Sequence, residues 1–230
     1  MFKKTFALAA LLSTTLIVTN LSAQTYLLGG LNAANITKDN AGNTEKNNTL
    51  LSFNAGFLHR FELDKAVNIE TGLGIEGRGS RAETTFNNGN DFVKSTFNPL
   101  YVTVPVNMVL KITNKKDYGI FAHLGGYAGV GVAGKSTTES KIGIIRTSSE
   151  KSIQFNNDDP FTSQQEDASY NKLKRFDYGL NLGGGISFNK IIIRLNYGIG
   201  LAKINSTEAN NNADDSNKFR VASLSIGFKL

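Results

Sequence analysis

The feature that most constrains this chain is a two-residue alternation of apolar and polar side chains, repeated along most of its length. In the clearest segment, Leu51, Phe53 and Phe57 share one parity, whereas Asn54 and Arg60 share the other. A period of two puts successive side chains on opposite faces of a β-strand. The pattern predicts eight strands, near residues 26–37, 50–61, 66–79, 98–112, 118–134, 173–188, 191–204 and 217–230.

The connections between these segments alternate strictly between short and long. The short ones are 62–65, 113–117 and 189–190, and the long ones are 38–49, 80–97, 135–172 and 205–216. With an even number of strands, both termini then lie at the end with the short turns. This plan is typical of outer-membrane barrels, which have short periplasmic turns and longer external loops. We therefore predict an all-β fold, an eight-stranded antiparallel up-and-down transmembrane β-barrel.

The strand positions that carry the apolar side chains, here called the apolar parity, are predicted to face outward; the alternate positions are called the polar parity. A soluble barrel would place the apolar parity inside, but the polar parity here is rich in glycine and charge, as at Glu70, Gly72 and Glu76. The interior of an eight-stranded barrel is just wide enough for side chains, and glycines leave space for long neighbours. An outward band of Leu, Ile, Val and Phe is a large exposed patch in water. In lipid it is the required surface of a closed barrel.

The first 23 residues have the organisation of a secretory signal peptide. Lys3 and Lys4 precede the apolar stretch 5–18, and small residues at Ser22 and Ala23 fit a cleavage site. Cleavage after Ala23 leaves a mature barrel domain of residues 24–230 in the bacterial outer membrane. The alternative is a retained anchor helix, for which the apolar stretch is short.

Composition excludes several classes of function. The chain has no cysteine, and therefore no disulfide, no thiolate metal site and no lipid-modified N-terminal cysteine. The formal charge of +6 falls to +4 without Lys3 and Lys4, and the remaining basic residues are scattered. A nucleic-acid partner is not expected, because such proteins cluster their positive charge.

The inward parity carries an ionic set. In so narrow a lumen these charges must pair, because an unpaired buried charge is costly. We expect several of them to form a network that plugs the barrel; the alternative is a gate or a narrow pore. The set comprises Arg60, Glu70, Glu76, Arg78, His123, Arg175, Asp177 and Arg194.

No pattern indicates catalysis or a bound cofactor. The two histidines have opposite parities, with His59 outward and His123 inward, and no outward His–Ser–acid set or metal-ligand spacing accompanies them. The glycine runs 125–131 and 183–185 lack the helix and Lys-Ser/Thr pair of a phosphate loop. We therefore predict no catalytic, cofactor-binding or metal residues, and no cofactor.

The two longest connections are predicted to form projecting hairpins. In loop 135–172 the β-like runs 142–146 and 152–155 surround a turn at 147–151. In loop 80–97 the turn signal is Asn87 to Asn90. Loops on a rigid scaffold often bind, so a protein partner is expected here besides outer-membrane lipid. The alternative is a hydrated cap.

Two finer expectations concern strand ends. Phe219 and Val221 are out of phase with Leu224 and Ile226, which predicts a bulge or a rim extension near Ala222 and Ser223. Aromatic residues near strand ends are candidates for interfacial girdles, although aromatics also favour strands in general. The candidates are Tyr26, Phe61, Phe97, Tyr118, Phe176, Phe188 and Phe219.

The export signal, the eight-strand pattern, the glycine-rich run 179–185 and the ending 225–230 together resemble the PorT-type outer-membrane β-barrel proteins of Bacteroidetes. The resemblance covers nearly the whole mature chain and is one of pattern, without a diagnostic motif. It implies a barrel of the cell envelope; the founding member is tied to protein secretion and gliding. We therefore expect a non-enzymatic structural or interaction component, with a small porin-like channel and an outer-membrane lipid hydrolase as alternatives.

Overall fold

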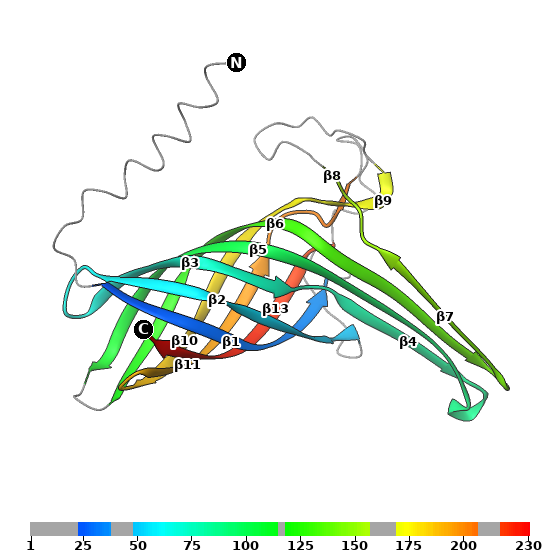
Figure 1. The fold of residues 1–230 in the computed structure, drawn as a ribbon, viewed down its shortest axis with the longest axis horizontal. Coiled ribbons are helices and arrows are strands. Elements are labelled where there is room, and N and C mark those ends of the chain that lie inside the picture. The colour runs from blue at the N-terminus through cyan, green and yellow to red at the C-terminus, as the bar shows by residue number, and fades with distance from the viewer. Residues whose placement is uncertain (1–22, 38–47, 115–117, 157–168, 207–216) are drawn as a thin grey trace, which may run out of the picture.

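The fold consists almost entirely of β-strands (Figure 1). The computed structural model describes residues 23–37, 48–114, 118–156, 169–206 and 217–230. The predicted signal segment 1–22 and parts of the predicted connections lie outside these residues. Within them, no helix is long and apolar enough to cross a membrane. The strands are β1 Ala23–Ile36, β2 Leu50–Glu62, β3 Val67–Gly77, β4 Ser80–Phe86, β5 Asp91–Asn114, β6 Tyr118–Ile142, β7 Ile145–Ser152, β8 Phe155–Asn156, β9 Ser169–Lys174, β10 Phe176–Phe188, β11 Ile191–Gly200, β12 Asn205–Ser206 and β13 Phe219–Lys229.

Eight of these strands pair into a ring. The order β5-β3-β2-β1-β13-β11-β10-β6 is continuous, and the pairing of β5 with β6 joins its two ends. Every pair in the ring is antiparallel and follows the chain order, which is the up-and-down arrangement. The backbone N–H of Leu230 donates to the carbonyl of Thr25 over 2.9 Å, so the last residue belongs to the wall. The predicted fold class is confirmed, with strand ends that differ by a few residues.

Strands β5 and β6 continue far past the ring. Their pairing runs from Asn114 and Gly119 to Phe92 and Lys141, with register shifts at Leu100/Tyr101 and Lys111/Thr113. Beyond the ring, β4 pairs with β5 and β7 pairs with β6. The result is a four-stranded sheet, here called the extension, which comprises β4, residues 91–98, residues 135–142 and β7. It projects from the end of the barrel that bears the long connections, here called the mouth (Figure 1).

Both long connections form hairpins in the extension, but only the first pairs the predicted segments; the second pairs residues 135–142 with 145–152 instead of 142–146 with 152–155. The β4–β5 hairpin turns at Asn87–Gly89, as the sequence signal indicated. The second hairpin turns at Gly143 and Ile144 instead of 147–151. Gly143 has a φ of +60°, which suits the first central residue of a two-residue hairpin turn. Residues 147–151 lie within β7, because a tight turn at Gly143 leaves them to pair with β6.

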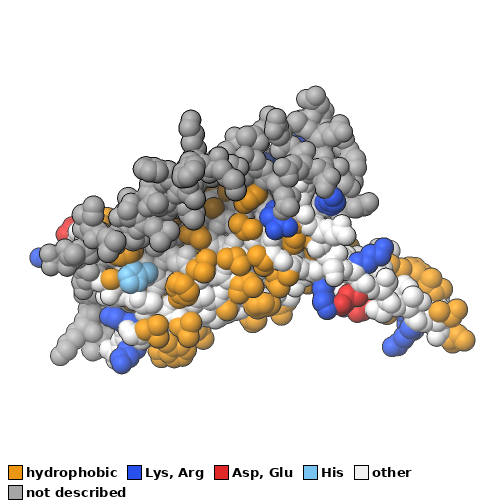
Figure 2. All heavy atoms as spheres, turned by 45° about the horizontal axis from the view of Figure 1, so that its top comes forward, with side chains coloured by type: hydrophobic (Ala, Val, Ile, Leu, Met, Phe, Trp, Pro, Cys, Tyr) orange, Lys and Arg blue, Asp and Glu red, His pale blue; other side chains and the backbone are white. Residues whose placement is uncertain are grey.

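The apolar parity faces outward, as predicted. Leu51 is 70% exposed and Leu195 61%, whereas Arg60 and Arg194 on the opposite parity are buried. Outward apolar side chains extend over the strands of the wall, and one side of this band is visible in Figure 2. An apolar surface of this kind suits the hydrocarbon core of a membrane. A closed ring of strands is also suited to it, because every strand is hydrogen-bonded on both sides and no edge is left open.

The predicted bulge in the last strand and two of the girdle candidates were wrong. No register shift interrupts the pairing of β13 at Ala222 and Ser223. Phe219 and Val221 keep the inward parity and are buried, because the lumen becomes apolar at the mouth. Tyr26 and Phe219 are therefore not girdle residues, since both lie inside the barrel. Tyr118 and Phe188 are exposed on the outside.

An apolar cluster lies at the mouth. Its buried members are Tyr101, Leu173, Ile204 and Phe219, and Ile36, Phe97, Ile153 and Phe155 pack against it. Phe155 belongs to the small sheet of β8, β9 and β12. Its ring contacts Tyr101 edge to face at 5.7 Å and lies over Gly131, where an added Cβ would stand 2.2 Å from it. The mouth is therefore filled by side chains from both the wall and the connections.

Candidate functional site in the barrel lumen

One ionic cluster lies at the end of the lumen that bears the short turns, and its centre is Glu70. The Glu70 side chain is completely buried (0% exposed). Arg60 Nη2 donates to its Oε2 over 2.8 Å, and Arg194 Nη1 donates to its Oε1 over 2.6 Å. Asn107 Nδ2 adds a third hydrogen bond over 3.2 Å. Glu70 of β3 thus links Arg60 of β2 to Arg194 of β11, a strand that is distant in the sequence. We call this the turn-end cluster.

Aromatic rings hold Arg60 in this cluster. Its guanidinium carbon lies 4.6 Å from the centre of the Phe121 ring and 5.3 Å from that of Tyr26. Such cation–π contacts are strongest where the cation has lost water. His123 lies beside Phe121, and its Nε2 is 2.9 Å from Asn196 Oδ1. The turn-end cluster is therefore braced by rings as well as by charge.

A second cluster surrounds Arg78 nearer the mouth. Arg78, the residue after β3, forms ion pairs with Glu76 of β3 and with Asp177 of β10. Its guanidinium lies 4.3 Å from the Tyr127 ring centre, and the Tyr127 hydroxyl donates to Asp177 Oδ2 over 3.0 Å. Tyr101 flanks Arg78 at 5.6 Å and donates to the Lys174 carbonyl over 3.1 Å. We call this the mouth-end cluster.

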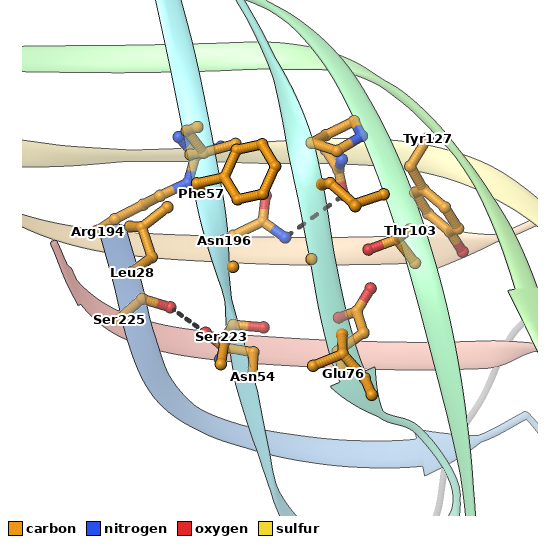
Figure 3. Close-up of a pocket in the computed structure, with 18 residues that line it drawn as sticks. Leu28, Asn54, Phe57, Glu76, Thr103, Tyr127, Arg194, Asn196, Ser223 and Ser225 are labelled. Atoms are coloured by element: carbon orange, nitrogen blue, oxygen red, sulfur yellow. Dashed lines mark hydrogen bonds between the residues drawn. The ribbon is translucent and has the colours of Figure 1, made fainter. Parts of the chain in front are cut away.

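A cavity of about 110 Å³, lined by both polar and apolar residues, lies between the two clusters (Figure 3). Glu76 borders it on the mouth side and Arg194 on the turn side. Its other polar walls are joined by hydrogen bonds from Ser225 Oγ to Asn54 Oδ1 over 2.8 Å and from Asn196 Nδ2 to Asn181 Oδ1 over 3.4 Å. The cavity has room for several water molecules with polar partners, as buried water requires.

The glycines of β10 make room for rings of β6. Each inward glycine stands directly opposite an inward ring in the register: Gly179 opposite Tyr127, Gly183 opposite His123, and Gly185 opposite Phe121. A Cβ added at Gly183 would stand 2.2 Å from the Leu195 carbonyl oxygen of β11 and 2.5 Å from the His123 ring. One added at Gly185 would stand 2.2 Å from the Ile193 carbonyl oxygen and 2.7 Å from the Phe121 ring. The glycine-rich run is thus a row of spaces that lets the aromatic parts of both clusters fit inside eight strands.

Seven of the eight sequence-predicted residues lie in or beside these clusters. Arg60, Glu70 and Arg194 form one, Glu76, Arg78 and Asp177 form the other, and His123 lies beside the first. Arg175 does not join them: it makes no ion pair with another described residue, and its backbone instead bonds Gly131 and Asn156.

Sequence reasoning missed the residues that support the charges. Tyr101, Tyr127 and Phe121 share the inward parity, which is the one signal that could have indicated them. Which ring faces which guanidinium depends on the register across several strands. Outside the lumen, His59 Nδ1 lies 2.7 Å from Thr25 Oγ1, and no carboxylate of the described residues forms a hydrogen bond with this histidine. Within the described residues, no group of three His, Asp or Glu side chains could hold a metal ion.

Three solved structures are similar to this chain along most of its length. Each match covers 91% of this chain and 99% of the other. They are the attachment invasion locus protein Ail of Yersinia pestis (16% identity, TM-score 0.41), Ail in complex with the heparin analogue sucrose octasulfate (14%, 0.39) and neisserial surface protein A (8%, 0.42). A search of curated proteins finds no match.

A match to a family model covers most of the chain. Residues 21–206 match the model described as the outer membrane protein beta-barrel domain. This span includes seven of the eight ring strands and the whole extension. Together with the outward apolar band, it assigns the protein to the outer membrane. The chain belongs to the outer membrane protein beta-barrel domain family.

Proposed function

We propose that this protein is a non-enzymatic interaction component of the outer membrane, with a sealed lumen and a binding surface on the extension. The observation that carries the proposal is the continuity of β5 and β6 from the wall into the four-stranded extension. A sheet held in this way is ordered before it meets a partner, so binding does not have to order a loop. The extension contains loop 80–97 and residues 135–152 of loop 135–172, and these two loops are where a partner was expected from the sequence.

The arrangement of the lumen supports a sealed barrel. The turn-end cluster, the mouth-end cluster and the apolar mouth cluster lie one after another along the axis and fill it with side chains. Opening a path for solutes through the lumen would require these paired charges to separate, which would leave a buried charge unpaired. Their pairing instead favours one fixed strand register. We therefore assign the ionic residues a structural role.

Export and a narrower family assignment belong to the same proposal. We infer that residues 1–23 are a cleaved signal peptide, which would deliver the barrel to the outer membrane. The resemblance to PorT-type proteins would place the interaction within protein secretion or gliding. Retention of residues 1–23 in protein from outer membranes, measured by mass spectrometry of the intact chain, would contradict the cleavage.

Shortening the extension tests the binding role. Residues 82–95 and 137–150 can each be replaced by Asn-Gly, because each segment begins and ends at cross-strand partners. The shortened barrel should still fold, as judged by heat-modifiable migration in gels, and should lose the partners that crosslink to the full-length protein in outer membranes. An unchanged set of crosslinked partners would refute the extension as the binding surface.

A small channel is the second candidate, and the cavity between the two clusters is the observation in its favour. Opening of either flanking cluster would extend this cavity along the axis. Planar-bilayer recordings of the purified barrel distinguish the candidates, because a sealed lumen gives no reproducible conductance steps.

A further inference from the structure

The far end of the extension carries apolar side chains that point into solvent. Ile144 is fully exposed (101%), Ile145 is 68% exposed and Ile142 is 58% exposed. Phe86 and Val93, from the neighbouring hairpin, are also exposed. We call these five residues the tip. Figure 2 shows apolar side chains gathered at this end of the molecule.

The tip has a defined shape. Ile142 and Ile145 are cross-strand partners, and Gly143 and Ile144 form the turn between them. Asp91 Oδ1 accepts a 2.7 Å hydrogen bond from the backbone N–H of Gly143. Because Asp91 pairs with Phe86 in the other hairpin, this bond joins the two hairpin ends. The isoleucines therefore project from a braced convex edge.

Two cations flank the tip on the other face of the sheet. Lys141 and Arg146 stand directly opposite each other in the register, one residue before Ile142 and one after Ile145. Like charges in this position destabilise a strand pair. Asp91 lies near Lys141, while the neighbouring Lys94 is already paired with Glu139 at 3.8 Å. The tip thus combines exposed aliphatic side chains with a local excess of positive charge.

This combination fits a membrane surface better than a protein pocket. Protein interfaces concentrate their binding energy in Trp, Tyr and Arg at the centre of a concave fit. The tip has neither Trp nor Tyr, and the described apolar side chains stand on a convex end. Segments that bind bilayers combine apolar side chains that enter the acyl boundary with Lys and Arg that meet anionic headgroups. The sides of the extension are rich in Ser and Thr, which suits the water between the membrane that holds the barrel and the surface that the tip would meet.

The extension also has the length to reach a second surface. Asp91 lies seven residues beyond Asn98 along β5, or roughly 25 Å at the rise of an extended strand. We propose that the tip inserts into an anionic lipid surface opposite the membrane that holds the barrel. This inference rests on the proposed function and names lipid as the partner of the extension.

The absence of tryptophan from the chain makes the proposal directly testable. In an Ile144→Trp variant the new indole is the only one, and Ser149→Trp on β7 is the matched control on the side of the extension. Each barrel is held in a zwitterionic nanodisc, and vesicles of phosphatidylglycerol or phosphatidylcholine are added. With the anionic vesicles, the indole emission of the Ile144→Trp variant should shift to shorter wavelength and be quenched by brominated acyl chains. The emission of the Ser149→Trp variant should do neither.

Two further variants, assayed by co-sedimentation with the same vesicles, separate insertion from charge. Ile144→Asp should abolish binding of the barrel to vesicles. The double variant Lys141→Gln/Arg146→Gln should weaken it by roughly 30-fold, since each basic residue contributes about 1 kcal/mol at an anionic surface. Unshifted emission from the Ile144→Trp variant, or Ile144→Asp binding equal to wild type, overturns the proposal. If an extension-dependent protein is captured in crosslinking while the vesicles are not bound, the lipid proposal fails and the proposed function stands.

Discussion

Glu70 joins three strands through one carboxylate. It accepts hydrogen bonds from Arg60, Arg194 and Asn107, and both arginines lose their charge partner if it is removed. The neighbouring ion pair between Lys111 and Glu62 is similar in length, at 2.6 Å, but lies at the rim with Glu62 partly exposed. Comparing substitutions of Glu70 and Glu62 therefore separates the effect of burial from the effect of ion pairing.

Replacing Glu70 with Gln should destabilise the barrel by about 3–5 kcal/mol, because two buried guanidinium groups then lack a counter-charge. Glu62→Gln should cost no more than about 1 kcal/mol, as is usual for exposed pairs. Urea unfolding of the barrel in lipid vesicles, followed by tyrosine fluorescence, measures both. Equal effects of the two substitutions would show that burial of Glu70 is not what matters.

The space at Gly183 can be tested by exchanging sizes. Gly183→Val should destabilise the barrel by roughly 1–3 kcal/mol, as overpacking does, because the added Cβ meets the Leu195 carbonyl oxygen at 2.2 Å and the His123 ring at 2.5 Å. His123→Ala in the same chain should recover only the part of this loss that the ring causes, since the contact with the Leu195 carbonyl remains. The free energies of unfolding of the two single variants and the double variant give the coupling energy between the two positions. A coupling energy near zero would contradict the contact between Gly183 and His123.

At the scale of elements, the alternation of apolar and polar residues predicted the ring, whereas the hairpins of the extension were indicated only by turn signals and short β-like runs. The ring strands have one face toward lipid and one toward the lumen, so their sequences alternate. Residues 135–141 and 146–152 are exposed or half-exposed on both faces and consist largely of Ser, Thr, Lys and Glu, so no period appears. The same limit applies to the ionic site. Parity placed Arg78 and Asp177 in the lumen, but their pairing across 99 residues depends on register, which hydropathy alone does not give.

Within the extension, Asp91 should control how firmly the two hairpins are joined. Hydrogen bonds from the Gly143 N–H and then the Asn87 side chain lower the pKa of Asp91 below its ordinary value of 3.8. The stabilisation is therefore fully present above pH 3.8 and is lost as the pH falls through the lower, folded-state pKa. Asp91→Ala should remove it at every pH.

Amide hydrogen exchange at Gly143, corrected for the intrinsic pH dependence of exchange, measures this bond. Protection of Gly143 at neutral pH should be lower in Asp91→Ala than in wild type, and wild-type protection should fall only in strong acid. Glu83→Ala, which removes the exposed partner of Arg81 in the same hairpin, is the control and should leave Gly143 unchanged. Equal protection in all three proteins would show that Asp91 does not brace the turn.

For the whole molecule, the proposed sealing of the lumen involves three groups in series. The turn-end cluster, the mouth-end cluster and the apolar cluster around Phe155 and Phe219 follow one another along the axis. Opening one of them would leave the other two in place. We therefore propose that the ionic residues seal the lumen together with apolar side chains.

Conductance should appear only when all three groups are reduced. Wild type, Arg78→Ala, Arg194→Ala and Phe155→Ala should each give silent planar bilayers, whereas the triple variant Arg78→Ala/Arg194→Ala/Phe155→Ala should give discrete steps. Open pores from wild type would refute the sealed lumen and favour the channel candidate. A silent but correctly folded triple variant would show that other side chains close the axis.

The continuous strands that join the wall to the tip also determine how the protein would carry a mechanical load. A pull on the tip, directed along β5 and β6, stretches both strands lengthwise and is resisted together by the many cross-strand bonds that fasten them to their neighbours in the ring. A loop under the same tension would yield one bond at a time. The molecule is thus built so that a tether attached at its far end is anchored by the barrel as a whole.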